Sequence, residues 1–278
     1  MQVCVLGSGQ MGTGIASLLV QSSHINRIIL WGRSSSALEK SYIRIKKEVR
    51  RFTKNSTFSQ DELLTKLQLT CKLSDISSSD YCIEAIVEDL NSKCNLLTSA
   101  SKFLSNETII ATNTSSLSIT ALSMHVNTPE NVIGMHFFNP TSMMNLIEIV
   151  KGLNTAPNTV DCAIKLAKMV KKEPVFVNES PGFIVNRMLI PMINEAISIY
   201  ADGVATIEDI DKAMKLGANH PLGPMALADL IGTDVCLSIM ETLHFETGDP
   251  KYRAHPLLRQ YVRAGYLGRK VKQGFYKY

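Results

Sequence analysis

Hydrophobic and polar residues alternate in blocks along the first part of the chain. Residues 3–6 form a short apolar run, and a glycine-rich turn at residues 7–12 follows at once. Apolar residues then recur at helical spacing from Ile15 to Leu19, and a second β-rich run occupies residues 27–31. The order strand, glycine turn, helix, strand is typical of the opening βαβ unit of a dinucleotide-binding fold.

The residues of the glycine turn have separate expected uses. Gly7 permits the tight turn, Gly9 lets the backbone approach a pyrophosphate, and Gly12 lets the helix pack close to the strand. The pyrophosphate would face the helix N-terminus, where free N–H groups and the helix dipole favour an anion. We therefore expect this turn, including Gln10 and Met11, to bind a dinucleotide.

Apolar runs and helical patterns continue to alternate up to about residue 180. Helices are predicted over residues 34–53 and 91–104, and a further one carries Ala163, Leu166 and Val170. Further buried strands are predicted at residues 81–86, 108–111, 132–138, 146–150 and 175–177. This alternation predicts an α/β fold, with a Rossmann-type, mostly parallel sheet covered by helices on both faces.

The pattern becomes purely helical after Pro181. Helices are predicted over residues 183–200, 207–214, 224–243 and 255–264. Apolar residues go most of the way round the first of these, which predicts deep burial, and a second subunit is one way to provide it. We therefore predict two domains, a dinucleotide-binding domain at residues 1–180 and an all-α substrate and dimerisation domain at residues 181–278.

Composition excludes several classes of function. The 29 Lys and Arg against 25 Asp and Glu give a net charge of +4, which is too small to indicate nucleic-acid binding. No apolar run reaches the ~18 residues that span a bilayer, and the first residues read as a strand rather than a targeting segment. The six cysteines lack the spacing of a metal or redox motif. We expect a cytoplasmic protein with reduced thiols and no metal, membrane or nucleic-acid partner.

Further motifs match one family. They read NTSSLSI at residues 113–119, HFFNP at 136–140, PGFIVNR at 181–187, GANHPLGP at 217–224, and GRK and GFY at 268–270 and 274–276. With the glycine turn, they resemble the 3-hydroxyacyl-CoA dehydrogenases, especially the single-function bacterial 3-hydroxybutyryl-CoA dehydrogenases. The resemblance covers essentially the whole chain, in order.

The resemblance implies reversible hydride transfer between a nicotinamide dinucleotide and C3 of a short 3-hydroxyacyl-CoA. His136 matches the family's catalytic acid/base and Glu148 its partner, which fixes the imidazole tautomer and stabilises the imidazolium. Ser115 and Asn186 match residues that hydrogen-bond the substrate near its reacting oxygen. Taken by itself, Ser115 could equally cap a helix, unless Ser116 is the cap.

The resemblance also implies binding residues outside the glycine turn. Glu88, Lys93, Ser115, Asn139 and Lys270 match positions that contact the dinucleotide. A basic helix at residues 41–54 resembles the one that holds the nucleotide end of coenzyme A. Arg51 and Lys54 are its candidates for the phosphates, and a solvated helical face is the alternative.

The chain departs from the family at the ribose position. The family usually carries Asp at the end of the second strand, whereas this chain has Gly32, followed by Arg33 and Ser34. Loss of the carboxylate removes the repulsion of a 2′-phosphate, and Arg33 can pair with that phosphate. We therefore predict that NADP(H) is preferred and that NAD(H) is possible. In the alternative, Gly32 only loosens the turn and Arg33 stacks on adenine.

Two other functions stay open at this point. A related dehydrogenase could act on a small hydroxy acid or sugar acid without coenzyme A, sharing His136 and Glu148 but not needing the basic helix. A protein could also keep the fold and bind a dinucleotide without catalysis, although the complete set of Ser115, His136, Glu148 and Asn186 argues against this. Family members pair through the helical domain, so the resemblance implies a homodimer.

Overall fold

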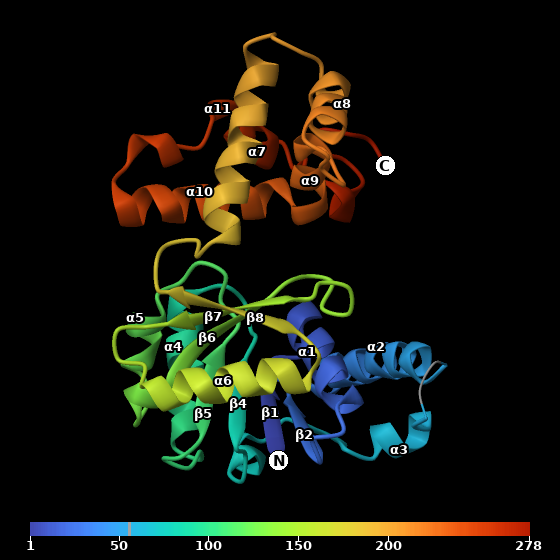
Figure 1. The fold of residues 1–278 in the computed structure, drawn as a ribbon, viewed down its shortest axis with the longest axis vertical. Coiled ribbons are helices and arrows are strands. Elements are labelled where there is room, and N and C mark those ends of the chain that lie inside the picture. Colours follow the sequence, from blue (N-terminus) through green and yellow to red (C-terminus); the bar gives the residue numbers. More distant parts are fainter. Residues whose placement is uncertain (55–56) are drawn as a thin grey trace. The chain divides into compact units, whose positions relative to one another are not determined.

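The computed structural model describes residues 1–54 and 57–278. These residues form two compact units, Met1–Ser180 and Pro181–Tyr278 (Figure 1). The first unit contains the sheet and the helices that cover it, and the second is built from helices.

One sheet of eight strands organises the described part of the first unit. Its strands are β1 (Gln2–Leu6), β2 (Arg27–Trp31), β3 (Leu67–Thr70), β4 (Tyr81–Glu84), β5 (Ile109–Thr112), β6 (Val132–Phe137), β7 (Leu146–Lys151) and β8 (Glu173–Asn178). Their order is β3-β2-β1-β4-β5-β6-β7-β8, and among neighbouring strands only the described pair β6–β7 is antiparallel. The predicted Rossmann-type, mostly parallel sheet is therefore confirmed.

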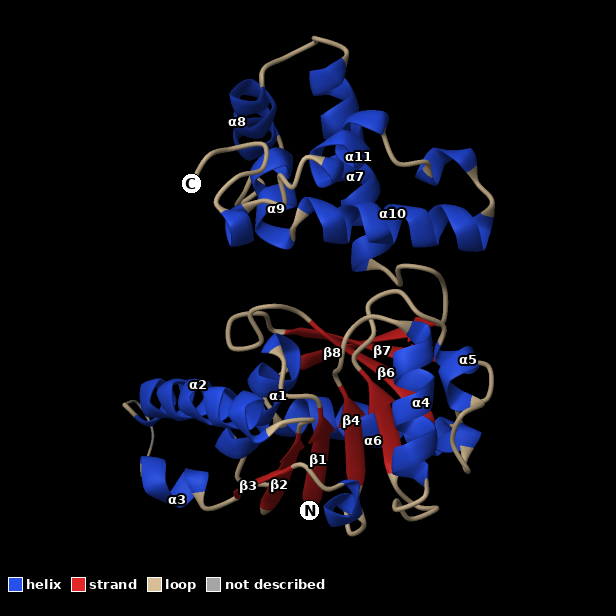
Figure 2. Cartoon of the chain, turned by 180° about the vertical axis from the view of Figure 1, so that it is seen from behind, coloured by secondary structure: helices blue, strands red, loops and turns tan. Residues whose placement is uncertain are grey.

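Helices cover both faces of this sheet. On one face, α1 (Gln10–Gln21), α2 (Ser35–Thr53) and α6 (Pro157–Met169) share a core with strand residues. α4 (Leu90–Ser101) and α5 (Ile119–Ser123) cover the other face. Figure 1 shows α6 in front of the strands, whereas Figure 2, seen from behind, shows α4 in front of them. A short helix, α3 (Gln60–Leu64), precedes β3.

The second unit has its own hydrophobic core. Its helices in the described residues are α7 (Val185–Ala201), α8 (Ile207–Gly217), α9 (Pro224–Ile231), α10 (Thr233–Thr247) and α11 (Pro256–Arg263). The chain end is held by the buried carboxylate of Asp229, which accepts hydrogen bonds of 2.8 Å from the backbone N–H groups of Phe275 and Tyr276. In the described part of the chain, no helix combines the length and apolar character needed to cross a membrane.

The structure differs from the sequence predictions at several places. β3 was not predicted. The single helix predicted over residues 224–243 is α9 and α10, because Gly232 between them has a φ of +108°. Ser116 does not cap a helix; Ser118 caps α5 by accepting a hydrogen bond from the Ala121 N–H. One face of the apolar helix α7 is buried in the chain itself, whereas Met188 is 72% exposed, so the burial of this helix by a second subunit stays a prediction.

Candidate active site

His136 and Glu148 form a buried pair at the end of the sheet. They lie directly opposite each other in the antiparallel register of β6 and β7. The His136 Nδ1 is 2.7 Å from the Glu148 Oε2, and the two residues are 6% and 0% exposed. A carboxylate on one imidazole nitrogen fixes the ring orientation and favours a proton on that nitrogen. The other nitrogen, Nε2, is then the one suited to exchanging protons with a substrate.

The segment that carries Ser115 is held by the carboxylate of Glu88. One oxygen, Oε1, accepts hydrogen bonds from the Thr114 hydroxyl at 2.6 Å and the Ser115 N–H at 2.7 Å. The Ser115 hydroxyl lies 3.1 Å from the same oxygen, and the Ser116 N–H also donates to it at 3.2 Å. Glu88 was expected to contact the dinucleotide, and the structure gives it this further contact with the Ser115 segment.

The same segment is held further along by Glu179. Its carboxylate accepts hydrogen bonds from the Ser118 hydroxyl at 2.6 Å and from the backbone N–H of Thr120. In addition, the side chain of Asn113 accepts a hydrogen bond of 2.9 Å from the N–H of Phe137, next to His136. The backbone around Ser115 and His136 is thus held by side chains that follow three different strands, β4, β5 and β8.

Lys93 lies deep in the structure, behind Glu88. Its ammonium is 1% exposed and donates to both carboxylate oxygens of Glu84, at 2.7 and 2.8 Å. It also lies 3.4 Å from the Glu88 Oε2. Glu88, by contrast, has a side chain that is 36% exposed. The expected contacts of Lys93 and Glu88 with the dinucleotide stay predictions. The sequence did not indicate Glu84, because a glutamate at a strand end usually faces solvent.

The glycine turn offers a cradle for a pyrophosphate. A Cβ at Gly7 would lie 2.5 Å from the Ala85 carbonyl oxygen, and one at Gly12 would lie 1.9 Å from the Gly7 carbonyl oxygen. Gly9, by contrast, has no atom within 4 Å of an added Cβ, and no side chain caps the N-terminus of α1 there. Open space in front of unpaired helix N–H groups fits an anion such as a pyrophosphate.

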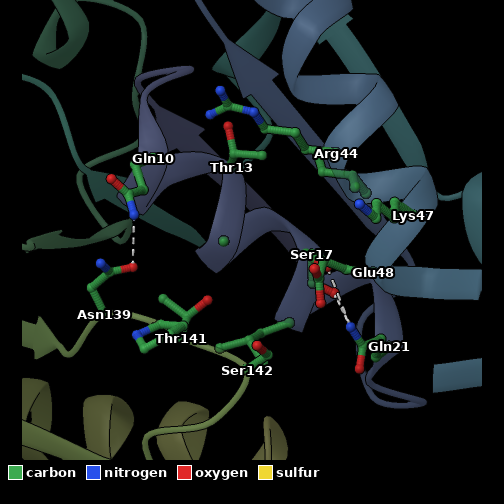
Figure 3. A pocket seen from close by; sticks show the side chains of 14 residues that line it. Gln10, Thr13, Ser17, Gln21, Arg44, Lys47, Glu48, Asn139, Thr141 and Ser142 are labelled. Carbon is green, nitrogen blue, oxygen red and sulfur yellow. Dashed lines mark hydrogen bonds between the residues drawn. The ribbon is translucent and has the colours of Figure 1, made fainter. Parts of the chain in front are cut away.

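Two predicted dinucleotide residues that lie far apart in the sequence meet beside this turn. The Gln10 side-chain amide donates a hydrogen bond of 3.0 Å to the side-chain oxygen of Asn139 (Figure 3). Met11 is half-buried in the first turn of α1 and packs against the core. Gln10 and Asn139 therefore contribute to one surface.

The ribose end of this surface is closely packed around Gly32. An added Cβ there would lie 2.7 Å from the Ser8 Oγ and 3.0 Å from side-chain carbons of Leu38. Arg33 is exposed, and Ser34 caps α2 by accepting a hydrogen bond from the Ala37 N–H. The close contacts mean that an acidic side chain at position 32 would require Ser8 and Leu38 to move.

The basic helix α2 contributes to a cleft with residues that differ from the expected ones. Arg44 and Lys47 line a cleft of about 440 Å³, together with side chains of α1 and the loop at residues 139–142 (Figure 3). Arg51 instead pairs with Glu48 on the surface at 2.9 Å, and Lys54 is exposed at the end of α2. Positions 44, 47 and 48 are three and four residues apart, a spacing that places them on one face of α2 and that could have indicated this cleft.

The remaining two predicted residues belong to the second unit. Asn186 lies half-buried in the first turn of α7. The Lys270 ammonium lies 2.6 Å from both carboxylate oxygens of Asp234, in the first turn of α10. Their contacts with substrate and dinucleotide stay predictions. Among the residues that the structure describes, no group of three or more His, Cys, Asp or Glu could hold a metal ion.

Comparisons with known proteins agree with the resemblance seen in the motifs. The family model for the NAD binding domain of 3-hydroxyacyl-CoA dehydrogenase matches residues 2–180, and the model for its C-terminal domain matches residues 182–278. The 3-hydroxybutyryl-CoA dehydrogenase of Clostridioides difficile is 48% identical over 281 residues, covering 100% of this chain and 99% of that protein.

More distant relatives and a solved structure extend this agreement. The mitochondrial hydroxyacyl-coenzyme A dehydrogenase of Homo sapiens is 37% identical, covering 99% of this chain and 90% of that protein. The crystal structure of (S)-3-hydroxybutyryl-CoA dehydrogenase PaaH1 from Ralstonia eutropha matches with a TM-score of 0.93 at 40% identity, covering 100% of this chain and 98% of that one. The chain therefore belongs to the 3-hydroxyacyl-CoA dehydrogenase family.

Proposed function

We propose that this chain catalyses the reversible reduction of a short 3-ketoacyl-CoA to the 3-hydroxyacyl-CoA, with acetoacetyl-CoA as the model substrate. The observation that carries the proposal is the buried His136–Glu148 pair, with 2.7 Å between the Nδ1 and the Oε2. An imidazole supported in this way is suited to moving a proton to and from an alcohol oxygen. The names of the similar proteins supply the substrate class.

The residues of the chain divide the chemistry as follows. In the reductive direction, the His136 imidazolium donates its Nε2 proton to the 3-keto oxygen, and in the oxidative direction the neutral imidazole takes that proton back. The Glu148 carboxylate stabilises the imidazolium through Nδ1. Ser115 and Asn186 hydrogen-bond the reacting oxygen and stabilise the charge that develops on it. The bound nicotinamide coenzyme supplies or accepts the hydride.

The coenzyme is held by the glycine turn and by Glu88, Asn139 and Lys270. We propose a preference for NADP(H) because no carboxylate ends β2. The packing of Ser8 and Leu38 against Gly32 supports this assignment, since an acidic side chain there would require both to move. The exposed Arg33, together with Ser34, is suited to a 2′-phosphate.

The nucleotide end of coenzyme A is assigned to the basic face of α2. The cleft lined by Arg44 and Lys47 supports this role, because it combines cations with the loop that follows β6. Arg51 and Lys54 extend the same basic surface toward the end of the helix. Guanidinium and ammonium groups in such an arrangement are suited to phosphates.

The test is reduction of acetoacetyl-CoA and of free acetoacetate at equal concentrations, followed by coenzyme absorbance. We expect turnover of the thioester and at least a hundredfold lower kcat/KM for the free acid, because it lacks every contact with coenzyme A. Equal rates would instead identify a small hydroxy-acid dehydrogenase. Coenzyme binding with no turnover of either compound would identify a dinucleotide-binding protein without this activity.

A further inference from the structure

A buried charged group lies behind the Ser115 segment and takes no direct part in the proposed chemistry. Its members are Glu84, at the end of β4, and Lys93, on α4. Both side chains are nearly inaccessible, at 0% and 1% exposure. Burying two charges costs several kcal/mol each before their mutual attraction is counted, so the pair is a poor device for stability alone.

Hydrogen bonds to both of its oxygens hold the Glu84 carboxylate in place. Its Oε1 accepts hydrogen bonds of 2.7 Å from the Lys93 ammonium and from the backbone N–H of Ile86. Its Oε2 accepts from the same ammonium at 2.8 Å and from the Thr112 hydroxyl, on β5, at 2.6 Å. Because four hydrogen bonds fix the carboxylate, the Lys93 ammonium has one defined position beside Glu88.

Glu88 connects the Lys93 ammonium to the Ser115 segment. Lys93 lies 3.4 Å from one oxygen of Glu88, and the other oxygen accepts from Thr114, Ser115 and Ser116. Burial would raise the pKa of the Glu88 carboxyl, but the Lys93 charge and the donors from Thr114 and Ser115 outweigh it and hold the pKa below its ordinary value. Glu88 therefore stays an ionised acceptor for the backbone that presents Ser115.

We propose that Glu84 and Lys93 are positioning residues for Ser115, acting through the ionised carboxylate of Glu88. The inference rests on the proposed role of Ser115 at the reacting oxygen. Glu84 holds the Lys93 ammonium in place, and the positive charge of Lys93 keeps the Glu88 carboxylate ionised. Glu88 in turn accepts hydrogen bonds from residues 114–116. Loss of the pair would loosen this segment and move the Ser115 hydroxyl away from its working position.

The test uses a variant that removes both charges together, Glu84→Gln with Lys93→Met. Removing only one partner would leave an uncompensated buried charge and could prevent folding, whereas a neutral pair of similar volume is often tolerated. The kcat and KM for acetoacetyl-CoA are measured in the parent and in a Ser115→Ala background, which lacks the hydroxyl but keeps the backbone N–H. We expect kcat to fall about tenfold in the parent background and less than twofold in the Ser115→Ala background.

The alternative to a positioning role is general support of the fold. It predicts the same loss of kcat in both backgrounds, and that result, or no loss in either, would overturn the inference. If the neutral pair does not fold, Glu84→Asp takes its place, because it keeps every charge but shortens the side chain that holds the Lys93 ammonium. A loss of about threefold in kcat that again depends on Ser115 is then expected, and an equal loss in both backgrounds would overturn the inference.

Hydrogen exchange separates this inference from the proposed function, because it needs no turnover. The N–H groups of Ser115 and Ser116 should exchange at least tenfold faster in the neutral pair, since Glu88 then holds them less firmly. The N–H of Ala85, which donates to the Leu6 carbonyl within the sheet, should be unchanged. Unchanged exchange at Ser115 and Ser116 would contradict the inference even in an active enzyme. Faster exchange in a chain that does not reduce acetoacetyl-CoA would support the positioning role of Glu84 and Lys93 and would contradict the proposed function.

Discussion

We propose that the choice of coenzyme depends on a few atoms around Gly32. Arg33→Ala should lower kcat/KM for NADPH by at least tenfold and leave the value for NADH within twofold, because a charge-assisted contact with the 2′-phosphate contributes about 1.5–3 kcal/mol. Steady-state kinetics with each coenzyme measure this. Arg27→Ala is the matched control, since Arg27 is an exposed cation at the other end of β2, where it bonds Gln68. Equal losses for the two coenzymes would refute the assignment.

A carboxylate cannot simply be returned to this site. Gly32→Asp alone should weaken the binding of NADPH without strengthening the binding of NADH, since its Cβ would meet the Ser8 Oγ and Leu38. Adding Ser8→Gly removes the nearest obstacle and should give the NADH preference. The measurement is the dissociation constant of each coenzyme, obtained by fluorescence titration. NADH binding in the single variant as tight as in the double variant would show that the packing has no influence.

Sequence reasoning at this scale succeeded where a motif marks the residue. His136 and Glu148 could be paired because they lie on consecutive strands. Glu84 and Lys93 could not, because nothing in an isolated Glu or Lys indicates that it is buried and paired. The basic face of α2 was found, but which of its cations line the cleft depends on the helix rotation against α1.

At the scale of elements, Gly232 separates two helices that the apolar pattern joins. Its φ of +108° is unfavourable for residues with a Cβ, and an added Cβ would lie 2.8 Å from the Asp234 carboxylate. Gly232→Ala should therefore lower the free energy of unfolding by about 1–3 kcal/mol. Urea denaturation measures it. In the control Gly217→Ala, the added Cβ meets nothing within 4 Å and stability should be equal or higher; similar midpoints for the two variants would contradict this account.

Elements were predictable in proportion to their burial. Strands such as β4 and β5 are mostly apolar and are buried throughout, and both were found. The edge strand β3 reads Leu-Gln-Leu-Thr and is mostly half-buried, so four residues did not give a distinct signal. The break at Gly232 was missed because the apolar spacing continues across it. The residue types around a glycine do not show which backbone angle it adopts.

At the scale of the whole molecule, we propose that two copies of the chain associate through the helical unit. Apolar side chains are exposed in this unit, and a second copy of the chain would remove such side chains from water. They include Met188, Val204, Leu216 and Phe245. Light scattering should give about twice the chain mass of 30.7 kDa. Met188→Lys should lower this toward a single chain, whereas Met124→Lys, at an equally exposed methionine of the first unit, should not. A monomeric parent chain would exclude the dimer.

The central claim is that His136, supported by Glu148, exchanges the proton of the 3-hydroxyl group of a 3-hydroxyacyl-CoA. The most direct test measures kcat/KM for acetoacetyl-CoA in the parent, in His136→Ala and in Glu148→Gln, with coenzyme binding as the control for folding. We expect a fall of about 10²- to 10⁴-fold for His136→Ala and a smaller fall of at least tenfold for Glu148→Gln, with coenzyme binding retained in both. Undiminished turnover in His136→Ala would contradict the account.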